Sequence, residues 1–174
     1  MLKDMLNRWL DGFERQWGYD ASYMRDVIGA SPASLVKFAL GTRAADAKAA
    51  PLEALFAAQL AGVLTEDCGP CTQLGVDMAI ASGIDPGVVR GALAGDDAAM
   101  GETASLVLRF AQASLARDMA TADPLREEIV RRWGEKALVA IGLSLVASRM
   151  YPTLKYALGH GKACSKVVVA GVAA

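Results

Sequence analysis

The sequence has little of the residues that build sheets or carry most chemistry. Aromatic residues make up 6% of its 174 residues, and it holds three cysteines and a single histidine. Hydrophobic residues make up 53%, with alanine and leucine recurring throughout, which favours closely packed helices over a sheet that needs β-branched and aromatic side chains. We therefore predict an all-α, single-domain bundle of about eight helices.

The sequence also lacks an excess of charge of one sign. It has 18 basic and 19 acidic residues, so its formal net charge is −1, and we expect neither a nucleic-acid nor a membrane partner. The chain opens with charged residues where a signal peptide would be apolar, and its longest apolar run, residues 137–147, is about half of a bilayer span. These features predict a cytoplasmic protein.

Apolar residues at helical spacing predict helices along the first half of the chain. One such helix covers residues 2–17. Asp20 is expected to cap a short second helix, and Ser31, followed by a proline, is expected to cap a third. A fourth helix after Pro51 carries an apolar stripe that Gln59 interrupts, and a polar residue inside a stripe of this kind needs a partner.

The second half of the chain continues the helical pattern. Asp85 and the proline after it predict one helix start, and residues 102–117 form another amphipathic segment. The Asp123-Pro124 pair predicts the start of a short helix. Residues 134–158 then read as a long, mostly buried helix that bends near Pro152.

We divide this single compact unit into two parts. Residues 1–34 are interpreted as an N-terminal helical extension, and residues 35–174 as the main helical domain. Residues 166–174 form a small apolar tail rich in valine and alanine. This tail has no periodic partner in the chain, so we expect it either to dock on a neighbouring subunit or to stay mobile.

The sharpest chemical signal is a pair of cysteines, Cys68 and Cys71, separated by Gly-Pro at a predicted helix start. Asp67 is expected to cap this helix, which would place a sulfur among the N–H groups of the first turn, where a thiolate is stabilised. Two thiols on one helical turn can close to a disulfide and reopen, which predicts a catalytic redox dithiol. The alternative is that both are small packing residues.

The region around these cysteines resembles the alkylhydroperoxidase D-like or carboxymuconolactone decarboxylase-like family. The similarity lies in a helical hairpin with Cys-x-x-Cys at the start of its second helix, followed by residues 83–86 and 133–159. It implies an all-α fold, homo-oligomers such as trimers, dimers or hexamers, and thiol peroxidase or disulfide reductase activity without a cofactor. Cys71 would then attack a small hydroperoxide or disulfide, Cys68 would resolve the intermediate, and a thiol reductant would restore the pair.

Two positions depart from the family pattern. Peroxidase members have a histidine four residues after the second cysteine and a glutamate twelve residues before the first, whereas this chain has Gly75 and Phe56 there. The usual proton relay is therefore missing. Glu66 is the nearest candidate substitute, with Gln59 as a possible hydrogen-bond partner.

Two other interpretations remain open. Cys68, Cys71, His160 and Cys164 supply the four ligands that a structural zinc site needs, although about ninety residues separate the two halves of this set. The chain could instead be a non-catalytic helical oligomer that binds a small ligand or a partner. The missing relay residues favour this second interpretation.

Overall fold

The computed structural model describes residues 1–161 and 167–169. Within these residues it contains eight helices and no strand, which confirms the all-α prediction. In chain order the helices are α1 Leu2–Trp17, α2 Ser22–Ala30, α3 Pro32–Gly41, α4 Leu52–Thr65, α5 Gly69–Ala81, α6 Pro86–Ala94, α7 Asp97–Ala116 and α8 Met119–Ala157.

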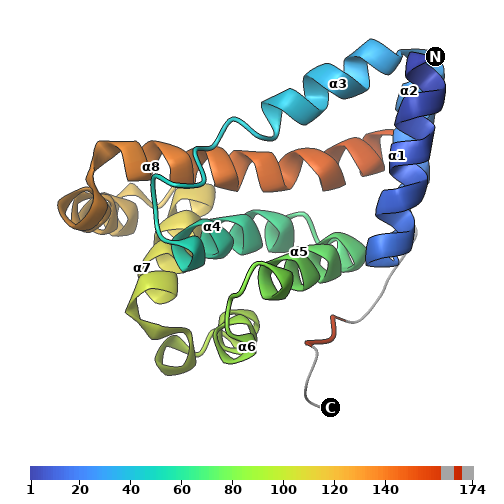
Figure 1. Ribbon diagram of the computed structural model, residues 1–174. Helices are drawn as coiled ribbons and strands as arrows, with labels where there is room; N and C mark the ends of the chain where they lie inside the picture. Colours follow the sequence, from blue (N-terminus) through green and yellow to red (C-terminus); the bar gives the residue numbers. More distant parts are fainter. Residues whose placement is uncertain (162–166, 170–174) are drawn as a thin grey trace.

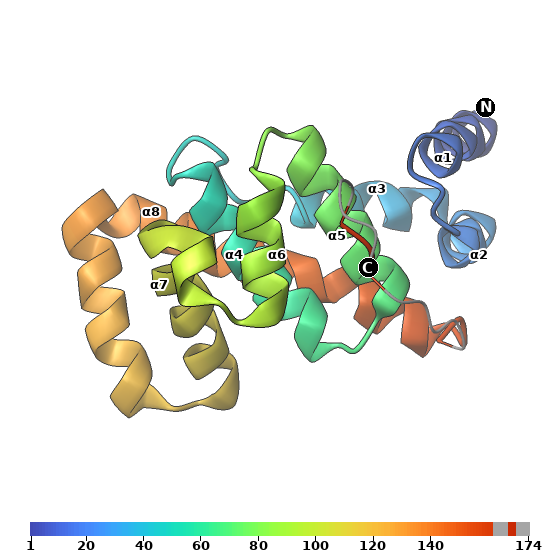
Figure 2. The same ribbon diagram turned by 90° about the horizontal axis from the view of Figure 1, so that it is seen from below.

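The core is built around α4, which is buried along most of its length and packs against α7 and α8. Helix α5 lies beside α4, and α6 packs on α7. Figure 1 shows α1 and α2 standing across one end of α8, with α3 running back above α8 toward the start of α4. In the perpendicular view of Figure 2, α1 and α2 lie at the opposite end of the molecule from α7.

Two glycines break the longer helices, and the sequence predicted a helix start beside each of them. Gly101 has φ 73° inside α7, and Gly134 has φ 81° inside α8. This left-handed region is open to glycine at little steric cost. The predicted helix starts at residues 102 and 134 therefore coincide with real changes of direction.

The predicted caps are partly confirmed. The Ser31 side chain accepts a hydrogen bond from the Ser34 N–H, and Asp85 accepts one from the Gly87 N–H. Two predicted starts are wrong. Asp20 accepts from the Ser22 N–H, but the N-cap position of α2 is Ala21. The helix assigned to Asp123-Pro124 begins earlier, at Met119, because the Asp118 side chain caps it by accepting from the Thr121 N–H.

Two further details concern polar side chains on α4 and α5. Gln59 is exposed rather than enclosed in the apolar stripe, so it does not need the buried partner that we expected.

In the described part of the tail, Val168 exchanges two hydrogen bonds with the Gln73 side chain, at 2.6 and 2.8 Å. These residues of the tail therefore dock on α5 of their own chain, and the rest of the tail lies outside the described residues.

Helix α8 is long and apolar enough to cross a membrane by length and composition alone, a property it shares with core helices of soluble proteins. In this structure it packs against α4 and α7. The cytoplasmic location remains a prediction.

The crossing of α4 and α8 generates a prediction on stability. A Cβ atom at Gly62 would lie 2.8 Å from the Leu145 carbonyl oxygen and 2.1 Å from Ser148 Oγ. We expect Gly62→Ala to lower the free energy of unfolding by about 1–3 kcal/mol, because the helices would have to separate. Urea denaturation measures this change. The control is Gly142→Ala, where a Cβ meets nothing within 4 Å and the helix should gain about 0.5–1 kcal/mol. Equal effects of the two substitutions would contradict the close approach.

Candidate functional site

The site begins with a sharp reversal of the chain between α4 and α5. Asp67 has φ 49°, a left-handed conformation that aspartate tolerates better than most residues. The predicted cap at Asp67 is therefore wrong, because Cys68 itself occupies the N-cap position of α5. The Cys68 carbonyl accepts the Thr72 N–H at 2.8 Å and the Thr72 hydroxyl at 3.0 Å. These bonds close the first turn of α5, which carries both cysteines.

Cys68 and Cys71 form a disulfide whose Cα atoms lie 5.2 Å apart. Both residues are buried, with exposed fractions of 3% and 7%. The structure thus brings together the two thiols of the predicted dithiol. The N–H groups in the first turn of a helix have no intrahelical partner, so the reduced pair lies where a thiolate is stabilised.

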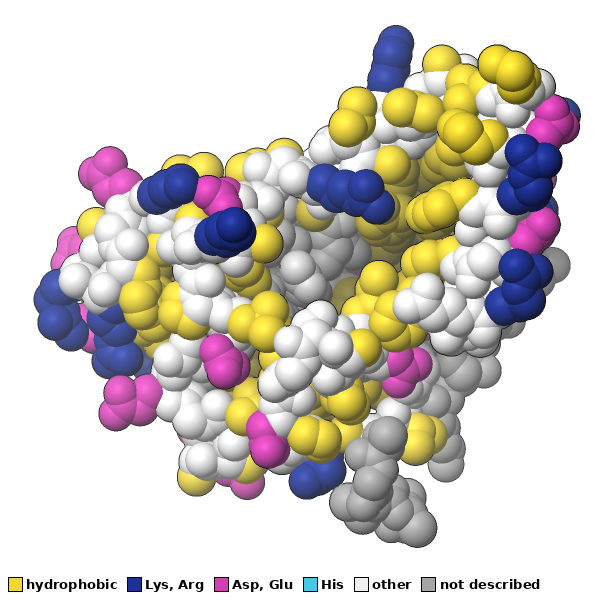
Figure 3. All heavy atoms as spheres, viewed as in Figure 1, with side chains coloured by type: hydrophobic (Ala, Val, Ile, Leu, Met, Phe, Trp, Pro, Cys, Tyr) yellow, Lys and Arg dark blue, Asp and Glu magenta, His cyan; other side chains and the backbone are white. Residues whose placement is uncertain are grey.

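A cavity of about 290 Å³ lies next to one of the two sulfurs. Cys71 lines it, together with residues of α1, α2, α3, α4, α5 and α8. Figure 3 shows the hollow, with hydrophobic side chains on its walls. The apolar walls include Trp9, Phe13, Phe56, Leu60, Leu74 and Met78.

The positions where the family resemblance expects a relay lie on this same cavity. Phe56 and Gly75 both line it, and neither carries an acid or a base. A Cβ at Gly75 would meet no atom within 4 Å, so space for a side chain exists there. The structure thus leaves this cavity without an acid or a base at residues 56 and 75.

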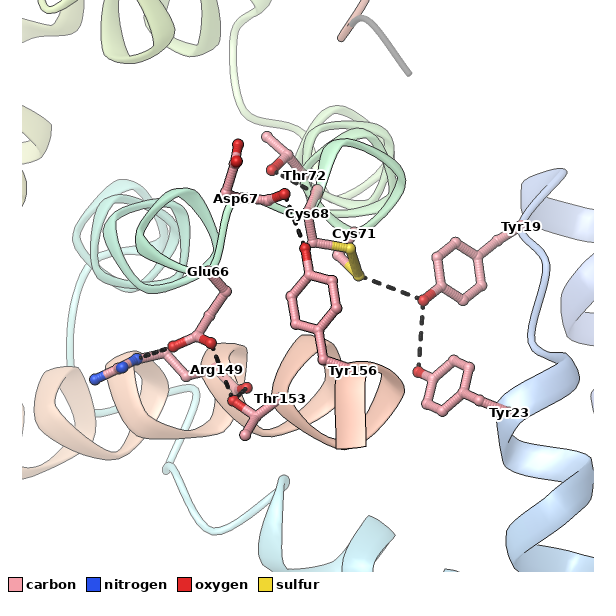
Figure 4. Close-up of a disulfide and its surroundings, with 10 residues drawn as sticks. All are labelled: Tyr19, Tyr23, Glu66, Asp67, Cys68, Cys71, Thr72, Arg149, Thr153 and Tyr156. Carbon is pink, nitrogen blue, oxygen red and sulfur yellow. Dashed lines mark hydrogen bonds and ion pairs between the residues drawn. A yellow bond between two sulfur atoms is a disulfide. The ribbon is translucent and has the colours of Figure 1, made fainter. Parts of the chain in front are cut away.

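Two tyrosines occupy the neighbourhood of Cys71. The Tyr19 hydroxyl lies 3.5 Å from Cys71 Sγ and 3.5 Å from the Tyr23 hydroxyl, as Figure 4 shows. Desolvation by burial raises the pKa of Tyr19 and also that of Tyr23, so both phenols stay neutral at ordinary pH. A neutral phenol can donate a hydrogen bond to the sulfur, but it cannot act as the base that removes the proton of the thiol.

Glu66, the predicted substitute acid or base, is engaged elsewhere. Its carboxylate accepts from Arg149 Nε at 2.6 Å and from the Thr153 hydroxyl at 3.2 Å. In Figure 4 it faces α8, on the side away from the sulfurs. The Tyr156 hydroxyl also donates to the Asp67 carbonyl at 2.8 Å. Glu66 therefore ties the reversal to α8, and its catalytic role stays a prediction.

The ligands of the zinc interpretation lie apart within the described residues. His160 Nδ1 lies 3.2 Å from the Ser22 hydroxyl, and Nε2 lies 2.7 Å from an Asp26 oxygen. Cys164 lies outside the described residues. Over residues 1–161 and 167–169, no group of three or more His, Cys, Asp or Glu side chains is placed to hold a metal ion.

Sequence reasoning missed Tyr19, Tyr23 and Lys155 as residues of the site. Tyr19 is 52 residues from Cys71 in the chain, and no local spacing links them. A weak signal was available, because two of the four tyrosines stand four residues apart near the helix start at Ser22. Arg149 and Lys155 reach the site only because α8 crosses beneath the α4–α5 reversal.

Comparison with known proteins yields no relative: no protein-family model, no curated protein and no solved structure matches the chain. The chain's own features therefore define its class. It is an all-α protein with a buried Cys-x-x-Cys disulfide at a helix start, beside an apolar cavity.

The variant Glu66→Gln tests whether Glu66 only anchors the α4–α5 reversal to α8 or also takes part in catalysis. We expect this variant to lose up to about 1 kcal/mol of stability with the loss of the partly exposed ion pair to Arg149. Its rate of oxidation by a hydroperoxide should stay close to that of the wild type, because the carboxylate faces away from the sulfurs. Urea denaturation and stopped-flow thiol oxidation measure the two effects. A rate loss of a hundredfold or so would instead make Glu66 the acid–base group of the site.

Proposed function

We propose that this protein is a dithiol oxidoreductase of the alkylhydroperoxidase D-like type, which reduces organic hydroperoxides or disulfides. The Cys71 thiolate attacks the terminal oxygen of a hydroperoxide ROOH, the O–O bond breaks, and ROH leaves after taking up a proton. The resulting Cys71 sulfenic acid is attacked by Cys68, the disulfide forms, and water leaves after hydroxide is protonated. A small thiol or a partner dithiol then reduces the disulfide by exchange.

The observation that carries this proposal is the unequal placement of the two sulfurs. Cys71 lines the cavity, whereas Cys68 occupies the N-cap position at the end of the α4–α5 reversal. A substrate in the cavity therefore meets Cys71 first. Cys68 is close enough to close the disulfide afterwards.

The walls of the cavity indicate the class of substrate. They carry large apolar side chains, and burying the apolar part of a substrate contributes about 25 cal/mol per Å² of surface removed from water. Hydrogen peroxide offers no such surface. An organic hydroperoxide or disulfide with a bulky apolar group suits this cavity better.

The proposal includes self-association and a cytoplasmic location. One face of α8 carries exposed apolar side chains at Val139, Leu143 and Val146, with exposed fractions of 60%, 36% and 58%. An apolar row of this kind suits contact with a second copy of the chain. A reducing compartment supplies the thiols that a cycling dithiol needs.

A second candidate function is binding without catalysis. The apolar cavity favours it, because a concave pocket with apolar walls is typical of a small-molecule site. In that case the cysteines only shape the wall of the cavity. The cysteine variants below distinguish the two functions.

The first test follows the thiols through one turnover. Reduced wild-type protein treated with one equivalent of cumene hydroperoxide should lose the Cys68 and Cys71 thiols and gain their disulfide. Cys71→Ser should abolish the reaction, because the attacking sulfur is gone. Cys68→Ser should stop at a sulfenic acid that dimedone traps. Mass spectrometry of peptides measures each product.

The matched control for this test is Cys164→Ser, which removes the third thiol of the chain and should oxidise like the wild type. The proposal fails if Cys68 and Cys71 stay reduced while Cys164 alone reacts. Ligand binding that persists in Cys71→Ser without any oxidation in the wild type would support the binding function instead.

A second test fills the cavity. Gly75→Leu adds a side chain where a Cβ meets no atom within 4 Å. We expect the reaction with cumene hydroperoxide to slow by about tenfold or more, because the variant displaces apolar binding volume worth about 0.8 kcal/mol per methylene. The reaction with hydrogen peroxide should change much less. Equal slowing with both oxidants would contradict the substrate class.

A further inference from the structure

The N-terminal extension brings a hydroxyl pair to the reactive sulfur. Tyr19 lies between α1 and α2, and Tyr23 is the second residue of α2. The Tyr19 hydroxyl lies 3.5 Å from Cys71 Sγ, and the Tyr23 hydroxyl lies 3.5 Å beyond it, from the Tyr19 hydroxyl (Figure 4). Both side chains are buried, with exposed fractions of 5% and 0%. This chain of hydroxyls ends on the same sulfur that lines the cavity.

The corner that carries Tyr19 is held by several contacts. Gly18 ends α1 in the left-handed conformation, and Glu14 accepts the Ala21 N–H at 3.0 Å. Arg25 of α2 bonds Glu14 and also reaches Asp11 at 2.9 Å. Because these bonds span α1 and α2, the position of the Tyr19 hydroxyl is fixed by both helices.

Helix α8 supplies a cation over the Tyr19 ring. Lys155 is buried, with an exposed fraction of 4%, and its Nζ lies 5.3 Å from the ring centroid. Lysine is seldom buried without a partner, and an ammonium at this distance from a ring is a cation–π contact. A positive charge here stabilises the phenolate that forms when Tyr19 gives up its proton. Burial raises the pKa of Tyr19 most; the hydrogen bond with Tyr23 lowers this pKa, whereas Asp20 and Tyr151 raise it.

We propose, on the basis of the proposed function, that Tyr19 is the proton donor of the dithiol site and that Tyr23 supports it through their hydrogen bond. Tyr19 would then take the place of an acid or base at positions 56 and 75, where this chain has Phe56 and Gly75. In the reduced protein the Tyr19 hydroxyl donates a hydrogen bond to the Cys71 thiolate. When the thiolate attacks ROOH and the O–O bond breaks, Tyr19 gives its proton to the departing alkoxide. The products of this step are Cys71 sulfenic acid, ROH and a Tyr19 phenolate, which Tyr23 and Lys155 stabilise.

The second half of the reaction restores Tyr19. Two neighbouring thiols do not both ionise readily, so Cys68 is still protonated beside the Cys71 thiolate. The phenolate takes up the proton that Cys68 releases as it attacks the sulfenic acid. The S–S bond forms, and hydroxide leaves and is protonated by solvent. Overall, the Cys71 thiolate, the Cys68 thiol, ROOH and one proton give the disulfide, ROH and water.

The test is Tyr19→Phe, which keeps the ring but removes the hydroxyl. We expect the reaction of reduced protein with cumene hydroperoxide to slow by about tenfold to a hundredfold. In a Cys68→Ser, Cys164→Ser background, where Cys71 is the sole thiol, the pH midpoint of iodoacetamide alkylation should rise by about one pH unit, because the thiolate loses a donor. Tyr23→Phe, which leaves Tyr19 in place, should move both readouts in the same direction by less.

Ser82→Ala is the control for the alkylation profile, because it removes a hydroxyl from the far end of α5. That exposed hydroxyl donates to the Met78 carbonyl at 2.7 Å, so its removal should leave the pH midpoint of Cys71 unchanged. If Tyr19→Phe and Tyr23→Phe both match the wild type in rate and pH midpoint, the inference is wrong although the dithiol function stands. If reduced wild-type protein does not form the disulfide with the hydroperoxide, the proposed function itself fails.

Discussion

The reversal of the chain at Asp67 is the constraint on which the site depends. A left-handed residue at this point places Cys68 at the N-cap of α5 and Cys71 one turn further, on the wall of the cavity. Arg149 holds the reversal to α8 through Glu66, and the Tyr156 hydroxyl holds the Asp67 carbonyl. Because α8 also carries Lys155, one helix both fixes the cysteine turn and sets the charge beside Tyr19.

The same arrangement gives the N-terminal helices a chemical role. Without α1 and α2, the cavity would lack Trp9, Phe13, Tyr19, Tyr23 and Met24 from its walls. Their presence removes water from the sulfur and leaves a hydroxyl as its neighbour. A hydrogen bond in such an apolar surrounding is stronger than the same bond in water. The helices that the sequence pattern marked as an extension therefore complete the proposed site.

Local signals in the sequence predicted the helices well, because caps and breaks depend on a few adjacent residues. Ser31, Asp85 and the glycines at 101 and 134 are examples. The cysteine spacing likewise predicted a closed pair. The predicted cap at Asp67 and the predicted helix start at Asp123 were wrong because another residue, Cys68 or Asp118, takes the N-cap position. Tyr19 was missed because its meeting with Cys71 depends on how α1 and α2 dock, which no local pattern records.

In the proposed reaction, one physical reason accounts both for the absence of an acid or base at residues 56 and 75 and for the use of the tyrosine pair. A glutamate and a histidine at positions 56 and 75 would place groups that carry a charge at or just below neutral pH on an apolar wall, and burying an unpaired charge is costly. Phe56 and Gly75 avoid this cost and leave room for an apolar substrate. Buried phenols stay neutral, since desolvation raises the pKa of Tyr19 and of Tyr23. In the proposed reaction they supply a proton without a resting charge, which suits a wall that binds an apolar substrate.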